Sequence, residues 1–131
     1  MSTNLQIIAQ HYAASDRGDL DEMLAVLAPD ARWTEMAGFP CAGTYVGPDA
    51  VRTGVFERLA AEWDGYTADI RELFDAGDTI VGLGEYSGSN KRTGESFRAR
   101  VAHVWRLTDG RVTAFEQFTD TLLVARATGE Y

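Results

Sequence analysis

The sequence is poor in cysteine and histidine, the residues that stabilise many small domains through disulfides or metal ions: its 131 residues include one cysteine and two histidines. A single cysteine, Cys41, excludes an internal disulfide and any zinc site built from several cysteines. Because Cys41 lies in a loop rich in Gly and Pro, with no basic partner nearby in the sequence, we expect a small buried or loop thiol.

Long apolar segments are also lacking. No run is long enough to span a bilayer, and no basic segment precedes an apolar one as in a secretory signal. We therefore expect a soluble, cytoplasmic protein without a membrane partner.

Basic residues are the scarcer charge, with 12 Lys and Arg against 20 Asp and Glu and a net charge of −8 at pH 7. Such a chain repels a phosphate backbone, and Lys91 and Arg92 lie in a turn, so we expect no nucleic-acid partner. Glycine-rich phosphate motifs and paired-histidine metal motifs are absent, which predicts neither a nucleotide cofactor nor a metal.

What is present is a change of periodicity within one domain, residues 1–131. Helical spacing predicts a first helix that ends near Gly18, and a second that Asp19 and Glu22 begin as a capping box and Pro29 ends. A third helix is predicted to open at Pro48 and to end at Asp64-Gly65. Strands are predicted around 32–36 and then over 66–74, 79–87, 95–107 and 111–124.

This order of elements predicts an α+β fold. We expect a cone-shaped, curved, antiparallel or mixed sheet with three N-terminal-half helices packed on its concave face, enclosing a pocket unless side chains fill it. The convex face carries arginines, valines and threonines and is available to a second copy of the chain. We therefore expect a homodimer through that face.

Glu35 is the first candidate for chemistry. In an extended segment Ala31, Trp33 and Glu35 share one face, so a carboxyl group follows an indole on the side that should face inward. Apolar surroundings raise the pKa of a carboxyl group toward the range useful for proton transfer. The alternative is that the strand frays here and Glu35 points to water.

His103 is the second candidate, since it lies between Val101 and Trp105 on the inward face of a long strand. It could act on a substrate as a neutral imidazole, or it could be a core histidine satisfied by one hydrogen bond. Asp120 on the last strand could orient it. Alternation places Gln117 and Asp120 on opposite faces unless a bulge intervenes, and an exposed Asp120 at the strand end is the alternative.

The remaining candidates are ligand contacts. His11 and Tyr12 project about 100° apart on the first helix, so we expect only one of them to point into the pocket. The full set of predicted substrate-binding residues is His11, Tyr12, Trp33, Phe39, Tyr45, Val55, Trp105 and Gln117. Dispersed His11, His103, Glu35 and Asp120 give a metal site only weak support.

Four segments, HYAASDRGDLDEMLAVLAPDARWTEMAG, AGTYVGPDAV, AHVWRLTDGRV and FEQFTDT, resemble the SnoaL-like group of the nuclear transport factor 2-like superfamily. Ketosteroid isomerases, limonene epoxide hydrolase and small polyketide cyclases share that fold. The resemblance places Glu35 where the isomerases keep a proton-abstracting aspartate, His103 where they keep a protonated aspartic acid, and His11 where they keep a tyrosine. The cyclases pair an inward histidine with an aspartate on the last strand, as His103 and Asp120 would.

Three functional hypotheses follow. The first is a cofactor-independent acid–base isomerase or aldol-type cyclase acting on a small, apolar carbonyl compound, with Glu35 or Asp120 as the base and His103 stabilising the enolate. The second is a non-catalytic ligand-binding module of the same fold. The third is a dimerisation domain whose cone is filled, which polar groups on the cone walls disfavour.

Overall fold

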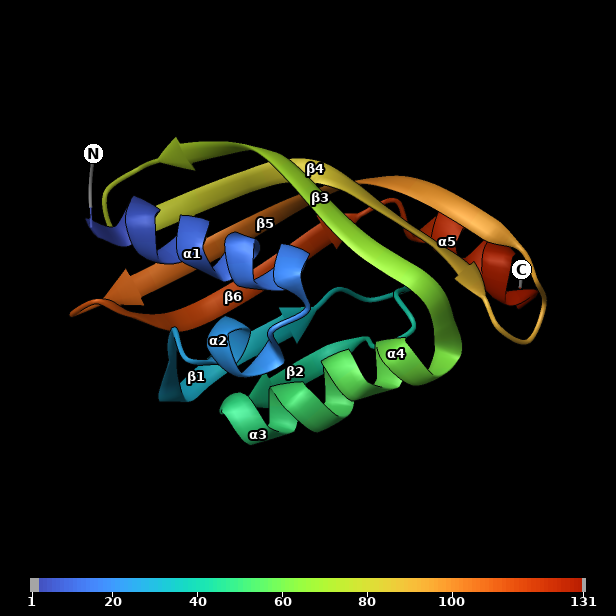
Figure 1. Ribbon diagram of the computed structural model, residues 1–131, viewed down its shortest axis with the longest axis horizontal. Helices are drawn as coiled ribbons and strands as arrows, with labels where there is room; N and C mark the ends of the chain where they lie inside the picture. The colour runs from blue at the N-terminus through green and yellow to red at the C-terminus, as the bar shows by residue number, and fades with distance from the viewer. Residues whose placement is uncertain (1–2, 131) are drawn as a thin grey trace.

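A computed structural model describes residues 3–130, which form a six-stranded sheet with helices mainly on one side (Figure 1). In chain order the elements are α1 (Thr3–Arg17), α2 (Leu20–Leu24), β1 (Leu27–Glu35), β2 (Gly43–Val46), α3 (Pro48–Val51), a π-helical turn (Arg52–Phe56), α4 (Glu57–Glu62), β3 (Trp63–Asp75), β4 (Thr79–Asn90), β5 (Ser96–Thr108), β6 (Arg111–Thr119) and α5 (Thr121–Thr128).

The sheet is curved and mixed, with the strand order β2-β1-β6-β5-β4-β3. All neighbouring strands pair antiparallel except β1 and β6, which pair parallel. The helices α1 to α4 cover the concave side (Figure 1). This confirms the predicted α+β fold.

Alternation along β5 decides which side of the sheet is the core. The inward residues Phe97, Ala99, Val101, His103, Trp105 and Leu107 are all buried. The arginines between them are exposed on the outward face. Strand parity therefore predicted the inward position of His103 correctly.

The prediction that Pro29 ends the second helix is wrong, because Pro29 lies inside β1. The helix α2 already ends at Leu24, and Leu27 belongs to the strand. The pairing of β1 with β6 is interrupted between Leu27 and Arg32, so the missing amide of Pro29 costs no ladder hydrogen bond there. The capping role of Asp19 is confirmed, because its side chain accepts from the amide of Glu22.

The predicted third helix is present but contains a π-helical turn at Arg52–Phe56 and ends at Glu62. Trp63 begins β3 instead, in an extended conformation. Val51, Val55 and Leu59 follow one another at helical spacing and are buried. The extra residue of the π-helical turn changes the phase of the helix in the middle of this buried stripe.

The last predicted strand is wrong beyond Thr119. The chain turns into α5, whose N-cap is Asp120 with its side chain accepting from the amide of Leu123, and whose C-cap is Gly129 at φ 78°. An N-cap aspartate followed by a run ending in a left-handed glycine is a helix signal. The apolar residues between them, Leu122 to Val124, are also compatible with a strand, which is why the sequence pattern predicts one.

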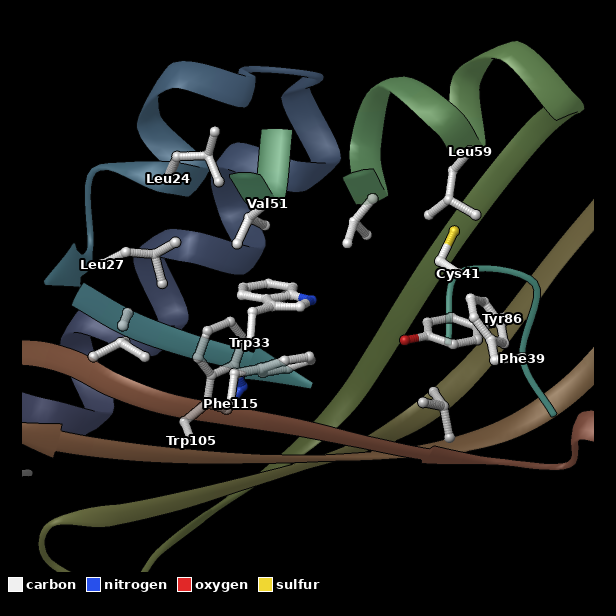
Figure 2. Close-up of a cluster of buried hydrophobic side chains, with 14 of the residues drawn as sticks. Leu24, Leu27, Trp33, Phe39, Cys41, Val51, Leu59, Tyr86, Trp105 and Phe115 are labelled. Carbon is white, nitrogen blue, oxygen red and sulfur yellow. The ribbon is translucent and has the colours of Figure 1, made fainter. Parts of the chain in front are cut away.

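Aromatic rings pack against one another within a core that also holds many aliphatic side chains (Figure 2). Trp33 stacks on Phe115 at a centroid distance of 3.9 Å, and Trp105 packs edge-on against Trp33 at 5.5 Å. Cys41, Phe39 and Tyr86 form a separate group near α4, where the Tyr86 hydroxyl points back toward the tryptophans (Figure 2). Cys41 is a free, buried thiol as expected, and burial raises its pKa to about 12.

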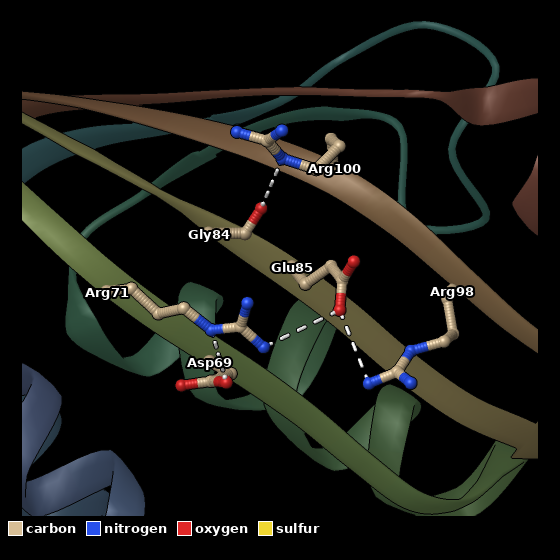
Figure 3. Close-up of polar contacts among 6 residues, drawn as sticks. All are labelled: Asp69, Arg71, Gly84, Glu85, Arg98 and Arg100. Atoms are coloured by element: carbon tan, nitrogen blue, oxygen red, sulfur yellow. Dashed lines mark hydrogen bonds and ion pairs between the residues drawn. The ribbon is translucent and has the colours of Figure 1, made fainter.

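The outward face of the sheet carries an apolar patch beside a charged cluster. The cross-strand register brings together Phe74, Val81, Leu83, Ala102, Val104 and Phe118. Beside them Glu85 pairs with Arg98 at 3.3 Å and with Arg71 at 3.8 Å (Figure 3). Among residues 3–130 no helix is long and apolar enough to cross a membrane.

Candidate functional site

Glu35 is the last residue of β1 and is 4% exposed. Its Oε2 accepts from the indole N–H of Trp33 at 3.2 Å, and its Oε1 accepts from the amide of Gln117 at 3.3 Å. Burial raises the pKa of Glu35 to about 8, against the smaller opposing effect of the Trp33 hydrogen bond. At neutral pH this side chain is therefore mainly a neutral carboxylic acid.

His103 is held between two tyrosine hydroxyls. Its Nδ1 lies 2.7 Å from the Tyr12 oxygen, and its Nε2 lies 2.6 Å from the Tyr86 oxygen. Burial, together with a smaller effect of nearby His11, lowers the pKa of His103 to about 3. His103 is thus a neutral imidazole under ordinary conditions.

These groups form one continuous hydrogen-bonded network. Trp105 donates to the Tyr12 oxygen at 2.8 Å, and Tyr12 meets His103. Beyond His103, Gln117 donates to the Tyr86 oxygen at 3.3 Å and also to Glu35. The Gln117 oxygen in turn accepts from the backbone amide of Met36 at 3.2 Å. The buried amide therefore joins the histidine to the carboxyl group.

The network leaves one hydroxyl hydrogen unused. A neutral imidazole has one N–H and one acceptor nitrogen, so one tyrosine donates to His103 while the other accepts from it. The oxygen of the accepting tyrosine is already a double acceptor, because Trp105 also donates to Tyr12 and Gln117 to Tyr86. Its own hydrogen then remains available to another oxygen.

His11 lies beside this network and is 3% exposed. Its Nδ1 is 2.9 Å from the carbonyl oxygen of Met23 on α2. Burial lowers the pKa of His11 to about 4, and the Met23 hydrogen bond opposes this only in part. Its ring packs edge-on against Trp105 at 4.6 Å.

The polar groups face a cavity of about 50 Å³ between α1, the π-helical turn and the sheet. It is lined by His11, Tyr12, Ser15, Met23, Trp33, Glu35, Val55, Phe56, Leu59, Tyr66, Ala68, Tyr86, His103, Trp105 and Phe115. Pockets for drug-sized ligands are roughly 300–1,000 Å³, so this space holds water-sized groups. The predicted open pocket is narrower than expected because aromatic rings fill most of the cone.

The structure brings together most of the predicted residues. Glu35, His103, Trp33, Val55 and Trp105 line the cavity, and both His11 and Tyr12 do so although one was expected. Of these two neighbours on α1, His11 contacts the Met23 carbonyl and Tyr12 contacts His103 on β5. Gln117 is fully buried behind the cavity wall and donates to Glu35 and Tyr86, which line the cavity.

Three predicted residues lie elsewhere. Asp120 is exposed and caps α5, and both ring nitrogens of His103 already face tyrosines, so the predicted Asp120–His103 pair does not form. Tyr45 donates to the Cys41 carbonyl at 2.8 Å, away from the cavity lining. Phe39 is buried but borders an outer groove.

The sequence reasoning missed Tyr86, Tyr66 and Phe56. Alternation along β4 could have identified Tyr86, because it shares the inward face with Ile80. Phe56 reaches the cavity through the π-helical turn, for which the sequence has no simple signal. In the part of the chain that the structure describes, no three His, Cys, Asp or Glu side chains form a metal-binding group.

The SnoaL-like domain family matches residues 8–115. The chain belongs to this family. Among solved structures, it is 60% identical to an NTF2-like protein from Burkholderia thailandensis, with a TM-score of 0.95 and 98% of each chain covered. It is 33% identical to an NTF2-like protein of unknown function from Burkholderia pseudomallei, with a TM-score of 0.89 and coverage of 97% and 98%.

A third solved structure was obtained with a ligand. TerC, co-crystallised with polyporic acid, is 25% identical with a TM-score of 0.85, and the alignment covers 98% of this chain and 99% of TerC. A search of curated proteins gives no significant match. The comparisons therefore establish the family and the fold.

Proposed function

We propose that this SnoaL-like protein moves a proton on a small, mainly apolar carbonyl compound, as an isomerase or aldol-type cyclase without a cofactor. One observation carries the proposal: a buried carboxyl group with a raised pKa, Glu35, faces the same cavity as a tyrosine–histidine–tyrosine chain. Perturbed acids beside a positioned donor are typical of proton-transfer sites.

In the proposed step, ionised Glu35 takes a proton from the carbon next to the carbonyl group. The C–H electron pair becomes the enolate double bond, and negative charge develops on the carbonyl oxygen. The hydroxyl hydrogen left free by His103, on Tyr12 or on Tyr86, stabilises that oxygen. Where the enolate is conjugated with a carbon–carbon double bond, return of the proton from Glu35 to the far carbon completes an isomerisation. In a cyclisation the enolate carbon instead attacks a second carbonyl carbon of the same molecule, the C=O electron pair moves to that oxygen, and the oxygen takes the proton from Glu35.

The environment of Glu35 suits both the uptake of a proton from the ligand and its return. With a pKa of about 8, roughly a tenth of the protein holds the ionised base at pH 7, and the protonated form readily returns the proton. His103 stays neutral, because its burial opposes any added charge. It therefore serves as a positioning residue for the two tyrosines.

Binding such a compound requires the lining to move. Phe56 is half-buried on the π-helical turn and packs edge-on against Trp33 at 5.6 Å. Ser15, Tyr66 and Ala68 are also half-buried cavity residues. We expect the ligand to enter at this rim and to displace Phe56.

Exchange of ketone α-protons tests the proposal. The unmodified protein should speed the exchange of the acetophenone methyl protons with D₂O, followed by NMR, and Glu35→Gln should abolish that acceleration. Asp120→Asn is the matched control, since asparagine also caps a helix and Asp120 lies away from the cavity. Binding of acetophenone without exchange would instead favour the non-catalytic ligand-binding module.

A further inference from the structure

The hydrogen bond to Met23 fixes the tautomer of His11. A backbone carbonyl oxygen only accepts, so Nδ1 at 2.9 Å from it must carry the ring hydrogen. Since the ring is neutral, Nε2 carries a lone pair and no hydrogen. His11 therefore presents an acceptor of defined position.

Both indole N–H groups beside His11 are already engaged. The Trp33 N–H donates to Glu35, and the Trp105 N–H donates to Tyr12. Within residues 3–130, the bond to Met23 is the one hydrogen bond that the His11 ring makes. His11 nevertheless lines the cavity while almost fully buried. Its Nε2 lone pair thus has no protein donor among the described residues and borders a space that can admit the donating group of a ligand.

We propose that His11 determines substrate specificity: its Nε2 accepts a hydrogen bond from a hydroxyl group of the ligand. The inference rests on the proposed function and narrows its substrate class to a hydroxylated carbonyl compound. Two other polar groups of the cavity, the Glu35 carboxyl and the spare tyrosine hydroxyl, suit the carbonyl end. The aromatic lining, which includes Trp33, Trp105 and Phe115, suits a flat apolar body between the two ends.

The probes are acetophenone and its 2-, 3- and 4-hydroxy derivatives, which differ only in the presence and position of a hydroxyl group. At least one hydroxylated probe should bind about fivefold more tightly than acetophenone, as expected for one added neutral hydrogen bond. Equal affinities for all four probes, including no binding by any of them, would overturn the proposal.

The matched variants are His11→Asn and His11→Gln. An asparagine amide can replace Nδ1 as the donor to Met23 but has no atom at Nε2, so the preference for the hydroxylated probe should disappear. Glutamine can place an amide oxygen near the Nε2 position and should retain part of the preference. A preference that survives unchanged in His11→Asn would contradict the proposal.

A spectroscopic readout applies to the unmodified protein. With two histidines in the chain, ¹⁵N-histidine labelling gives four ring signals. His11 should show a protonated Nδ1 and a bare Nε2, and the Nε2 signal should shift when the hydroxylated probe binds but not when acetophenone binds. A protonated Nε2, or a signal that the hydroxylated probe leaves in place, would overturn the inference. Exchange of acetophenone protons, which involves no hydroxyl group, tests the proposed function separately.

Discussion

The hydroxyl oxygens of Tyr12 and Tyr86 lie on opposite sides of the His103 ring, at 2.7 Å from Nδ1 and 2.6 Å from Nε2. The two tyrosines come from α1 and β4, so the imidazole links a helix to the sheet. Because a neutral imidazole can donate to only one of them, the state of one hydroxyl hydrogen depends on that of the other. This dependence is measurable.

Replacing the two tyrosines should give non-additive losses of stability. Tyr12→Phe or Tyr86→Phe each leaves a buried imidazole nitrogen without a partner and should lower the free energy of unfolding by about 1–3 kcal/mol. The double variant should differ from the sum by at least about 0.5 kcal/mol, because both act through His103. Urea unfolding of all four proteins measures this, and simple additivity would mean that the histidine does not couple them.

The pH dependence of stability should carry the signature of Glu35. Its pKa is raised on folding from 4.5 to about 8, so the stabilisation is fully present below about pH 4.5 and is lost as the pH rises through about 8. His11 and His103 have the opposite effect, because folding lowers their pKa values to about 4 and about 3. The protein therefore loses stability as the pH falls from 6.5 through those values. Stability should therefore decline on both sides of an intermediate pH.

Glu35→Gln isolates the alkaline limb of that profile. The unmodified protein should lose about 3 kcal/mol of this contribution between pH 5 and pH 8, and the variant should not. The amide oxygen of the variant cannot accept from both Trp33 and Gln117, so the substitution lowers the stability at every pH. The two proteins are therefore compared by the slope of the free energy of unfolding against pH. Parallel slopes for the two proteins in chemical unfolding would show that Glu35 is ionised throughout that range.

Two glycines should differ in how they tolerate alanine. A Cβ at Gly84 would lie 2.0 Å from the backbone oxygen of Asp69, whereas a Cβ at Gly54 would lie 2.3 Å from the ring of Tyr45. The strand backbone cannot yield, but the half-buried Tyr45 ring can turn outward. We expect Gly84→Ala to cost at least about 2 kcal/mol and Gly54→Ala about 1 kcal/mol, by thermal or urea unfolding. The reverse order would mean that the bulged β3–β4 pairing adapts more readily than the aromatic contact.

The outward face of the sheet leads us to expect a homodimer. Phe74 and Phe118 are 49% and 46% exposed there, and ion pairs around Glu85 border the patch (Figure 3). Such a patch is typical of an interface. Light scattering should give twice 14.4 kDa for the unmodified protein, and Val104→Glu at the patch centre should halve it. A mass of 14.4 kDa for the unmodified protein would exclude this assembly.

Strand parity accounts for what the sequence could predict of the site. Alternation along β1 and β5 placed Glu35, Trp33, His103 and Trp105 inward, since a buried face repeats every second residue. Asp120 was misplaced because a local capping preference outweighs an apolar run at a strand end. The contact between Tyr12 and His103 joins residues 91 apart in the chain, and only the assembled fold brings them together.

The pKa of Glu35 is the most direct test of the account, because the proposed proton transfer depends on a carboxyl group that can both take up and return a proton near neutral pH. Glutamate labelled with ¹³C at the carboxyl carbon, with the Glu35 signal identified by its absence in Glu35→Gln, gives this titration by NMR. We predict a midpoint near pH 8 for Glu35. A midpoint near 4.5, the ordinary value for a glutamate, would contradict the central claim.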